Sequence, residues 1–136
     1  MIAPADARRL VAAARAARRR AYAPYSRFQV GAAVLCRGQV HAGCNVENAS
    51  YGLTVCAERV AVGTMVAAGG RRLEAVAVAS GTSPPTPPCG ACLQTLAELG
   101  RPSLPVLLAG PRGKAVQTTL GELLPRSFGP GYLRRR

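Results

Sequence analysis

Two short cysteine motifs constrain the fold of this chain more than any other feature. Cys56-Ala57-Glu58-Arg59 opens one predicted helix, and Pro88-Cys89-Gly90-Ala91-Cys92 opens another, with Cys89 33 residues after Cys56. Cys89 and Cys92 are three positions apart, so at a helix start their thiols lie on one face. If the three thiols serve one site, the fold must bring two helix N-termini together, and their positive ends favour thiolates.

Three cysteine ligands are typical of a catalytic zinc site, because they leave the fourth tetrahedral position open. We therefore expect one zinc ion per chain, bound by Cys56, Cys89 and Cys92. Glu58 lies two residues after Cys56, so a helix turns it away from the ligands but leaves it able to reach a water in the open position. Zinc base deaminases combine a ligand-x-Glu motif with Pro-Cys-x-x-Cys and use the glutamate as general acid and base. The sequence therefore predicts Glu58 as the catalytic residue.

Residues near the three cysteines could balance the charge of a bound zinc ion or supply a fourth ligand to it. Three thiolates leave a net negative charge on a divalent ion, and Arg59 is placed three residues after Cys56 to donate hydrogen bonds to the sulfurs. Alternatively, Cys36, Cys44 or His41 supplies a fourth ligand and closes a structural zinc site. Both extra cysteines lie in strand-like runs, where a cysteine is usually a small core residue. We therefore favour the open, catalytic site over a noncatalytic zinc-stabilised module.

The rest of the chain predicts helices and strands in alternation, which is typical of an α/β layered domain with about five strands. The length of 136 residues suits one domain, residues 1–136. The segment 110–114 superficially resembles a phosphate-binding loop but lacks the required spacing and hydroxyl residue, so we interpret it as a turn. Helices are predicted at 4–22, 55–68, 89–99 and 120–124, and strands at 29–36, 39–46, 73–80, 105–109 and 115–119.

The charge balance is strongly basic, with 18 basic and 6 acidic residues and a net charge of +12. Nine arginines lie in residues 1–20 and 134–136. One interpretation is that these basic ends attract nucleic acid or an anionic surface. The other is that they form a solvated helix face and a basic C-terminal tail at about 130–136. The chain has no Trp, and its two Phe and four Tyr are scattered rather than spaced for base stacking. Nucleic acid is therefore not the partner that we expect first.

The cellular compartment is predicted from the absence of membrane-helix and signal-peptide patterns in the sequence and from its cysteine content. No apolar run approaches the roughly 18–20 residues of a membrane helix, and the first residues lack the apolar centre of a signal peptide. Five cysteines, an odd number that includes a Cys-x-x-Cys motif, indicate a reducing compartment. We expect a cytoplasmic protein that does not associate with membranes.

Four linked motifs resemble those of the small homotetrameric cytidine deaminases. They are Phe28-Gln-Val-Gly-Ala-Ala33, Gly43-Cys-Asn-Val-Glu-Asn-Ala-Ser-Tyr-Gly52 and the two cysteine motifs, and the match runs from about residue 22 to 129. The resemblance implies a three-layer α/β/α sandwich around a five-stranded mixed sheet. It also implies hydrolytic deamination of cytidine and 2′-deoxycytidine to uridine and 2′-deoxyuridine, with release of ammonia, as in pyrimidine salvage.

The resemblance also assigns substrate contacts. Asn45 and Glu47 match contacts to the ribose hydroxyls, and their alternate spacing on an extended segment aims both at one pocket. The alternative is a turn whose polar side chains bond to its own backbone. Phe28 matches the aromatic residue that packs on the pyrimidine, although a Phe at a strand start is commonly a core residue, and Ala57 joins the predicted substrate-binding set.

Other matching residues imply contacts between subunits. Ala49, Tyr51 and Phe128 correspond to residues that reach a neighbouring subunit's site, so the resemblance implies a homotetramer with composite active sites. One departure is Leu93, where many members of the family carry Arg beside the metal. The nearest alternative function is deamination of a cytosine-nucleoside antibiotic such as blasticidin S, but the segment 45–48 favours plain nucleosides. A second alternative is a basic nucleic-acid-binding or editing protein.

Overall fold

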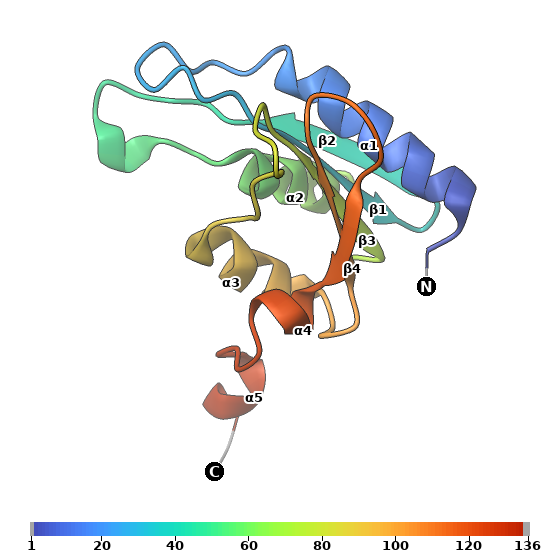
Figure 1. The fold of residues 1–136 in the computed structure, drawn as a ribbon. Helices are drawn as coiled ribbons and strands as arrows, with labels where there is room; N and C mark the ends of the chain where they lie inside the picture. Colours follow the sequence, from blue (N-terminus) through green and yellow to red (C-terminus); the bar gives the residue numbers. More distant parts are fainter. Residues whose placement is uncertain (1, 135–136) are drawn as a thin grey trace.

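The computed structural model describes residues 2–134, which form a five-stranded mixed sheet between two layers of helices (Figure 1). The strand order is β2-β1-β3-β4-β5. Strands β3 and β4 are parallel, and the other neighbouring pairs are antiparallel. The five-stranded mixed sheet expected from the resemblance is confirmed. Its strands are β1 (Gly31–Cys36), β2 (Gln39–Cys44), β3 (Ala75–Ala79), β4 (Pro105–Ala109) and β5 (Val116–Thr119).

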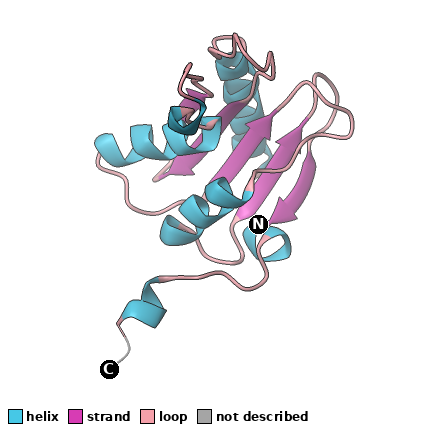
Figure 2. Cartoon of the chain, turned by 90° about the vertical axis from the view of Figure 1, so that its left-hand side faces the viewer, coloured by secondary structure: helices cyan, strands magenta, loops and turns pink. Residues whose placement is uncertain are grey.

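The helices divide between the two faces of the sheet. One face carries the N-terminal helix alone, and the other carries the two helices that begin at the cysteine motifs (Figures 1 and 2). Within residues 2–134, no helix has the length and apolar character needed to cross a membrane. The helices are α1 (Pro4–Arg18), η1 (Tyr51–Leu53, a 3₁₀ turn), α2 (Ala57–Ala67), α3 (Gly90–Leu99), α4 (Leu120–Leu123) and α5 (Pro130–Leu133).

Alternation along the buried strands builds two separate cores. On β1, Ala32 and Val34 point to the face covered by α2 and α3, where they join a cluster with Met65. Ala33 and Leu35 point to the opposite face and pack in a second cluster that includes α1. Because successive side chains of a strand point to opposite faces, one continuous apolar run serves both layers. The result is the three-layer α/β/α sandwich that the resemblance implies.

One glycine on each face allows a helix to approach the sheet closely. A Cβ at Gly31 would overlap the backbone carbonyl oxygen of Ala14 in α1. A Cβ at Gly43 would lie 2.5 Å from the backbone nitrogen of Ala61 in α2. Neither helix could keep its present position against a larger residue, because the atoms in the way belong to the backbone.

Helix α1 is shorter than its sequence predicts, ending at Arg18 rather than at residue 22. Tyr22 is extended and forms an isolated bridge with Val46. Its backbone N–H donates to the carbonyl oxygen of Asn45 at 3.0 Å. The pairing of Tyr22 with a segment distant in sequence replaces the last helical turn, so tertiary contact overrides local helix propensity here.

The C-terminal segment contains a helix that we did not predict. Residues 130–133 of the expected basic tail at 130–136 form α5, which stands apart from the sheet in both views (Figures 1 and 2). Residues 135 and 136, the end of that expected tail, lie outside the described residues. The segment 110–114 connects β4 to β5 as a turn, as interpreted from the sequence.

Candidate metal centre and active site

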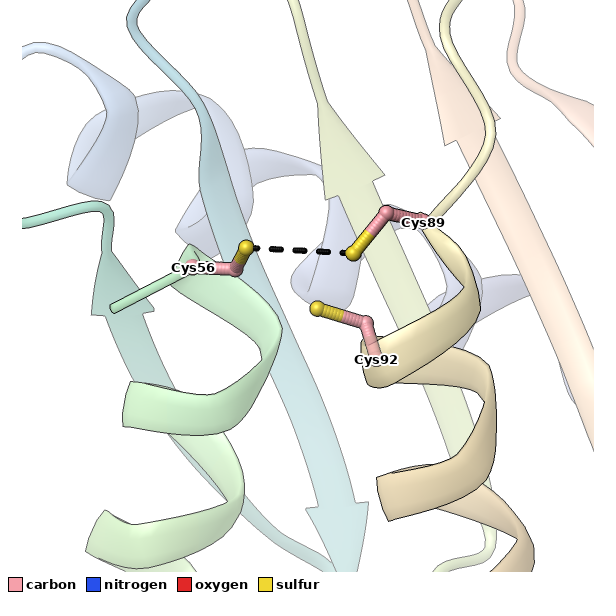
Figure 3. Close-up of side chains that lie close together, drawn as sticks. All are labelled: Cys56, Cys89 and Cys92. Atoms are coloured by element: carbon pink, nitrogen blue, oxygen red, sulfur yellow. Dashed lines mark hydrogen bonds between the residues drawn. The ribbon is translucent and has the colours of Figure 1, made fainter. Parts of the chain in front are cut away.

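The three cysteines of the two motifs meet where helices α2 and α3 begin. Cys56 is the N-cap residue of α2, Cys89 is the N-cap residue of α3, and Cys92 lies in the first turn of α3. Their sulfur atoms all lie within 4.8 Å of one another, and the Sγ atoms of Cys56 and Cys89 are 3.9 Å apart (Figure 3). Two converging helix N-termini therefore present three thiols to one point. Helix α3 begins at Gly90, one residue after the start predicted from the sequence.

The clustered thiols differ in how their surroundings shift their pKa values. Burial, together with the charges of Glu58 and Cys56, raises the pKa of Cys92 far above its usual range. Burial also opposes ionisation of Cys89, but hydrogen bonds from the backbone and side chain of Cys92 and from Cys56 lower its pKa. Hydrogen bonding thus favours ionisation of Cys89, whereas burial and neighbouring negative charge oppose ionisation of Cys92. Three sulfur donors that need a positive charge to ionise together suit a thiophilic divalent ion such as zinc.

Arg59 supplies a positive charge beside the cluster. Its Nη2 atom donates to the carbonyl oxygen of Thr54 at 3.2 Å and lies 3.9 Å from the Sγ atom of Cys56. The hydrogen bond to Cys56 raises the pKa of Arg59 further, which keeps the guanidinium charged. Its buried Nε atom has no hydrogen-bond partner among the described residues. Arg59 thus lies where it can offset thiolate charge, although its tuning of a bound metal remains a prediction.

The alternative fourth ligands lie elsewhere. Within residues 2–134, the metal-ligand cluster contains three side chains, and Cys36, Cys44 and His41 are not among them. Cys36 is buried in the core between the sheet and α2, and His41 lies on β2 opposite Val34. The described part of the chain therefore provides three ligand atoms and does not close the site with a fourth.

Glu58 is buried beside the thiols. Only 4% of the residue is exposed, and burial raises the pKa of its carboxyl group against the opposing effects of its own backbone N–H, Cys92 and Arg59. A raised pKa lets this carboxyl group hold and release a proton nearer neutral pH than an exposed glutamate does. It faces a cavity of about 160 Å³ lined by Phe28, Val30, Asn45, Thr54, Cys56, Ala57, Glu58, Val78, Ser80, Thr86, Pro87 and Cys89.

Hydroxyl groups in this lining were not predicted from the sequence. Ser80, which is 1% exposed, accepts a hydrogen bond from the backbone N–H of Thr86 at 3.1 Å. Its Oγ atom is 3.1 Å from the Oγ1 atom of Thr82, which is in turn 2.7 Å from that of Thr86. This network braces the loop that leads into Cys89. The sequence feature that could have identified Ser80 as a pocket residue is its position at the end of an otherwise apolar strand.

Three of the four predicted substrate contacts line the cavity. Phe28, Asn45 and Ala57 belong to its wall, whereas Glu47 lines a neighbouring cavity of about 300 Å³. The side-chain amide of Asn45 donates to the carbonyl oxygen of Phe28 at 2.8 Å and accepts from the N–H of Val30 at 2.9 Å. One N–H of this amide and one lone pair remain available to a ligand.

Glu47 braces the loop that precedes Phe28. Its Oε1 atom accepts from the backbone N–H groups of Tyr25, at 2.9 Å, and Ser26, at 3.2 Å, and its Oε2 atom accepts from the Ser26 hydroxyl. The hydrogen bond from that hydroxyl, with those from the two N–H groups, lowers the pKa of Glu47. Asn45 and Glu47 therefore bond to the distant segment 25–30 and not to the backbone of their own turn, which was the alternative interpretation. Thr54 borders both cavities and joins their linings.

The predicted intersubunit residues lie outside this cavity. Ala49, Tyr51 and Phe128 are exposed and do not line the cavity of about 160 Å³ beside Glu58, but Tyr51 lines the neighbouring cavity that contains Glu47. The side-chain amide of Gln94 donates to the carbonyl oxygen of Phe128 at 2.9 Å, which ties the C-terminal segment to α3. Leu93, which replaces the arginine common in the resembling family, is 8% exposed and packs in the core.

Comparison with known proteins now bears on this geometry. The family described as "Cytidine and deoxycytidylate deaminase zinc-binding region" matches residues 4–108, a range that includes all three clustered cysteines. The chain belongs to this deaminase family. The cytidine deaminase of Sporosarcina psychrophila is 45% identical over 124 residues, which are 90% of this chain and 91% of that protein. The cytidine deaminase of Halalkalibacterium halodurans is 49% identical over 124 residues, which are 90% and 94% of the two chains.

Solved structures of the family agree with the fold. The crystal structure of cytidine deaminase from Burkholderia pseudomallei matches with a TM-score of 0.85 and 52% identity, covering 89% of this chain and 98% of that chain. The cytidine deaminase structure from Mycobacterium tuberculosis matches with a TM-score of 0.80 and 45% identity, covering 91% and 98%. Membership of a zinc-binding deaminase family agrees with the zinc cofactor predicted from the cysteine spacing.

Proposed function

We propose that this chain catalyses the zinc-dependent hydrolytic deamination of cytidine and 2′-deoxycytidine to uridine and 2′-deoxyuridine, with release of ammonia. The observation that carries the proposal is the buried carboxyl group of Glu58 in a pocket that Cys56 and Cys89 also line. Family membership and relatives named cytidine deaminases support it. The names of these relatives favour a plain nucleoside substrate over blasticidin S or nucleic acid.

Cys56, Cys89 and Cys92 would hold one zinc ion per chain. Bound zinc supplies a Lewis acid that lowers the pKa of a water toward neutrality. Arg59 offsets the charge of the thiolates from the side of Cys56, where its guanidinium lies 3.9 Å from the sulfur. The three ligands leave room for water and substrate because the described chain contributes no fourth ligand atom to the cluster.

Glu58 moves the protons of the reaction. Its carboxylate takes a proton from the attacking water and delivers it to N3 of the cytosine ring. Once the water oxygen has bonded to C4, Glu58 takes the remaining proton of that oxygen and passes it to the exocyclic amine, so that the C4–N bond breaks, ammonia leaves and the C4 carbonyl forms. Burial suits the carboxyl group to both tasks, because the raised pKa brings its protonated and ionised forms closer in free energy near neutral pH.

The two adjoining cavities suit the two halves of a nucleoside. Phe28 and Ala57 offer apolar surface to the base in the first cavity. Asn45 uses its spare donor and acceptor toward a sugar hydroxyl, and Glu47 lies beyond Thr54 in the second cavity, where its carboxylate accepts from a hydroxyl of the same sugar. Free cytosine lacks these hydroxyls, and the phosphate of CMP is repelled by Glu47, so both are expected to be poor substrates.

We further propose a homotetramer in which Ala49, Tyr51 and Phe128 complete a neighbour's pocket. The catalytic cavity of about 160 Å³ is smaller than the roughly 300–1,000 Å³ typical of ligand sites. This supports a pocket whose wall is completed by a neighbouring subunit. Tyr51 is 74% exposed and Phe128 is 56% exposed, so each ring, although it contacts Tyr25 or Tyr132 on one side, presents most of its surface to a neighbour. Dilution to monomers should abolish activity, and a fully active monomer in light scattering would contradict this assembly.

The cellular setting that we propose is pyrimidine salvage in the cytoplasm. All five cysteines are free thiols, and a reducing compartment preserves the three that cluster at the metal centre. An oxidising compartment would favour disulfide formation between neighbouring thiols of the cluster and so compete with metal binding.

The decisive experiment is an ultraviolet assay of the purified protein and its Glu58→Gln variant on cytidine, 2′-deoxycytidine, cytosine and CMP. The amide keeps the shape of the carboxyl group but cannot shuttle protons, so turnover should fall by at least about 10²–10⁴-fold while zinc content stays near normal. Glu98→Gln is a matched control, because Glu98 is an exposed residue of α3. Near-normal turnover in Glu58→Gln would mean that another residue is the base.

A further inference from the structure

A separate groove lies on the face of the sheet opposite the cysteine cluster. It is a groove of about 530 Å³ between α1 and the β4–β5 edge of the sheet. This volume lies within the roughly 300–1,000 Å³ typical of small-molecule sites. Its wall includes Arg8, Val11 and Arg15 from α1, Leu107 from β4, and Lys114 and Gln117 from the turn and strand that follow.

The groove carries positive charge without a matching negative charge. Arg8, Arg15 and Lys114 line it, and no aspartate or glutamate does. Within residues 2–134, the ion pair found joins Arg9 to Asp6, so none of the three groove cations is neutralised by an ion pair there. Three cations around one concave surface favour an anionic ligand.

Arg15 is held in place by uncharged groups. Its Nε atom donates to the carbonyl oxygen of Gly110 at 3.2 Å, and its Nη2 atom donates to that of Gly113 at 2.8 Å. A guanidinium has five N–H donors, so three remain for a ligand after these two bonds. The turn between β4 and β5 thus holds the Arg15 guanidinium in place through uncharged carbonyl groups, so its positive charge is not neutralised. Because the side chain is already ordered, the entropic cost of binding an anion is lower.

The rest of the lining indicates the other half of the ligand. Val11, Leu107 and Ala115 give the groove an apolar wall, and Gln117 adds an amide with both donor and acceptor groups. A base or a ribose can form hydrogen bonds to that amide, whereas an acyl chain cannot. No aromatic side chain lines the groove, so it lacks the stacking platforms typical of single-stranded nucleic-acid sites.

We propose that this groove binds a nucleoside phosphate, with the phosphate against Arg8, Arg15 and Lys114 and the nucleoside along Val11, Leu107 and Gln117. The groove and the metal centre lie on opposite faces of the sheet and share no lining residue. The site therefore goes beyond the proposed deamination and does not depend on it.

The test is calorimetric titration of the full-length protein with ADP, adenosine and inorganic pyrophosphate in about 0.15 M salt, where the screening length is about 8 Å. A purine nucleotide avoids competition with a pyrimidine-specific catalytic pocket. We expect one ADP per chain, and adenosine and pyrophosphate should each bind at least about tenfold more weakly, because each lacks one half of the contacts. Equal affinity for pyrophosphate, or displacement of ADP by stoichiometric single-stranded oligonucleotide, would overturn the proposal.

Substitutions locate the site. Arg8→Gln should weaken ADP binding by about tenfold or more, the value of one hydrogen bond to a charged group, and Gln117→Glu should weaken it by placing a carboxylate in the groove. Arg20→Gln is the control, because it removes the same charge at an exposed position outside the groove. Equal weakening by Arg20→Gln would reduce the site to general charge attraction.

One further variant separates this site from the catalytic one. Glu58→Gln should bind ADP as the unmodified protein does, because Glu58 belongs to the cavity on the other face. Loss of ADP binding in Glu58→Gln would place the nucleotide in the catalytic pocket and overturn the proposal. If ADP binds at the groove but cytidine is not deaminated, the proposed function fails while this inference stands.

Discussion

The two faces of the sheet are built from the same strands but differ in chemistry. The face covered by α2 and α3 carries branched side chains such as Val34 and Val76, and at its edge lies the buried carboxyl group of Glu58. The face covered by α1 is lined largely by alanines such as Ala33 and Ala77, and its polar groups stay at an open rim. Two helices can converge on a point and bury charge there between their N-termini, whereas one helix lying along a sheet leaves charge in solvent.

The largest expected effect comes from a substitution in the cysteine cluster, on the face of the sheet covered by α2 and α3. Cys89→Ala removes one of three ligands, so zinc content and cytidine turnover should both fall to background. Cys36→Ala is the matched control, because Cys36 is a buried cysteine outside the cluster and should cost stability but not zinc. Elemental analysis and an ultraviolet assay measure both. Zinc retained in Cys89→Ala but lost in Cys36→Ala would contradict the assignment.

An intermediate effect compares the faces directly through their two glycines. Gly31→Ala and Gly43→Ala each drive a Cβ into helix backbone, so each should destabilise the protein by about 1–3 kcal/mol. Only Gly43→Ala displaces α2, the helix that carries Glu58, so only that variant should also lose turnover well below its unfolding temperature. Thermal unfolding and cytidine assays test the pair. Equal loss of turnover in both variants would show that the two layers are mechanically coupled.

The smallest effect concerns the loop beside the cavity. The hydrogen bonds from Ser26 and Tyr25 depress the pKa of Glu47 below its usual value of 4.5, so they stabilise the folded protein when the carboxylate is ionised. This contribution is present above pH 4.5 and is lost as the pH falls through the depressed pKa. Glu47→Gln should therefore be slightly less stable than the unmodified protein at neutral pH, with the difference shrinking in acid. A difference that grows on acidification would contradict these contacts.

The motifs predicted the site better than its surroundings. The spacing of Cys89 and Cys92 placed these two thiols on one face of a helix start by local helix geometry, and the motif pattern of zinc base deaminases linked Cys56 to them. Ser80 and Thr86 escaped notice, since a hydroxyl becomes part of a pocket only when a strand end and a loop meet. The brace that Glu47 forms with Ser26 was also missed, because its partner lies 21 residues away.

The sequence by itself determined the alternation of helices and strands, the two-sided pattern of the buried strands and the pairing of Cys89 with Cys92 on one helix face, because periodicity and spacing act within a few residues of each position. Tertiary structure brought Cys56, which lies 33 residues before Cys89, to the same point. Tertiary structure alone decided that α1 stops at Arg18, since the backbone of Tyr22 bonds to Asn45 and Glu47 instead of continuing the helix. It also decided the direction in which the pKa of Glu58 shifts. The raised pKa of that carboxyl group comes from burial by side chains brought in from separate segments of the chain.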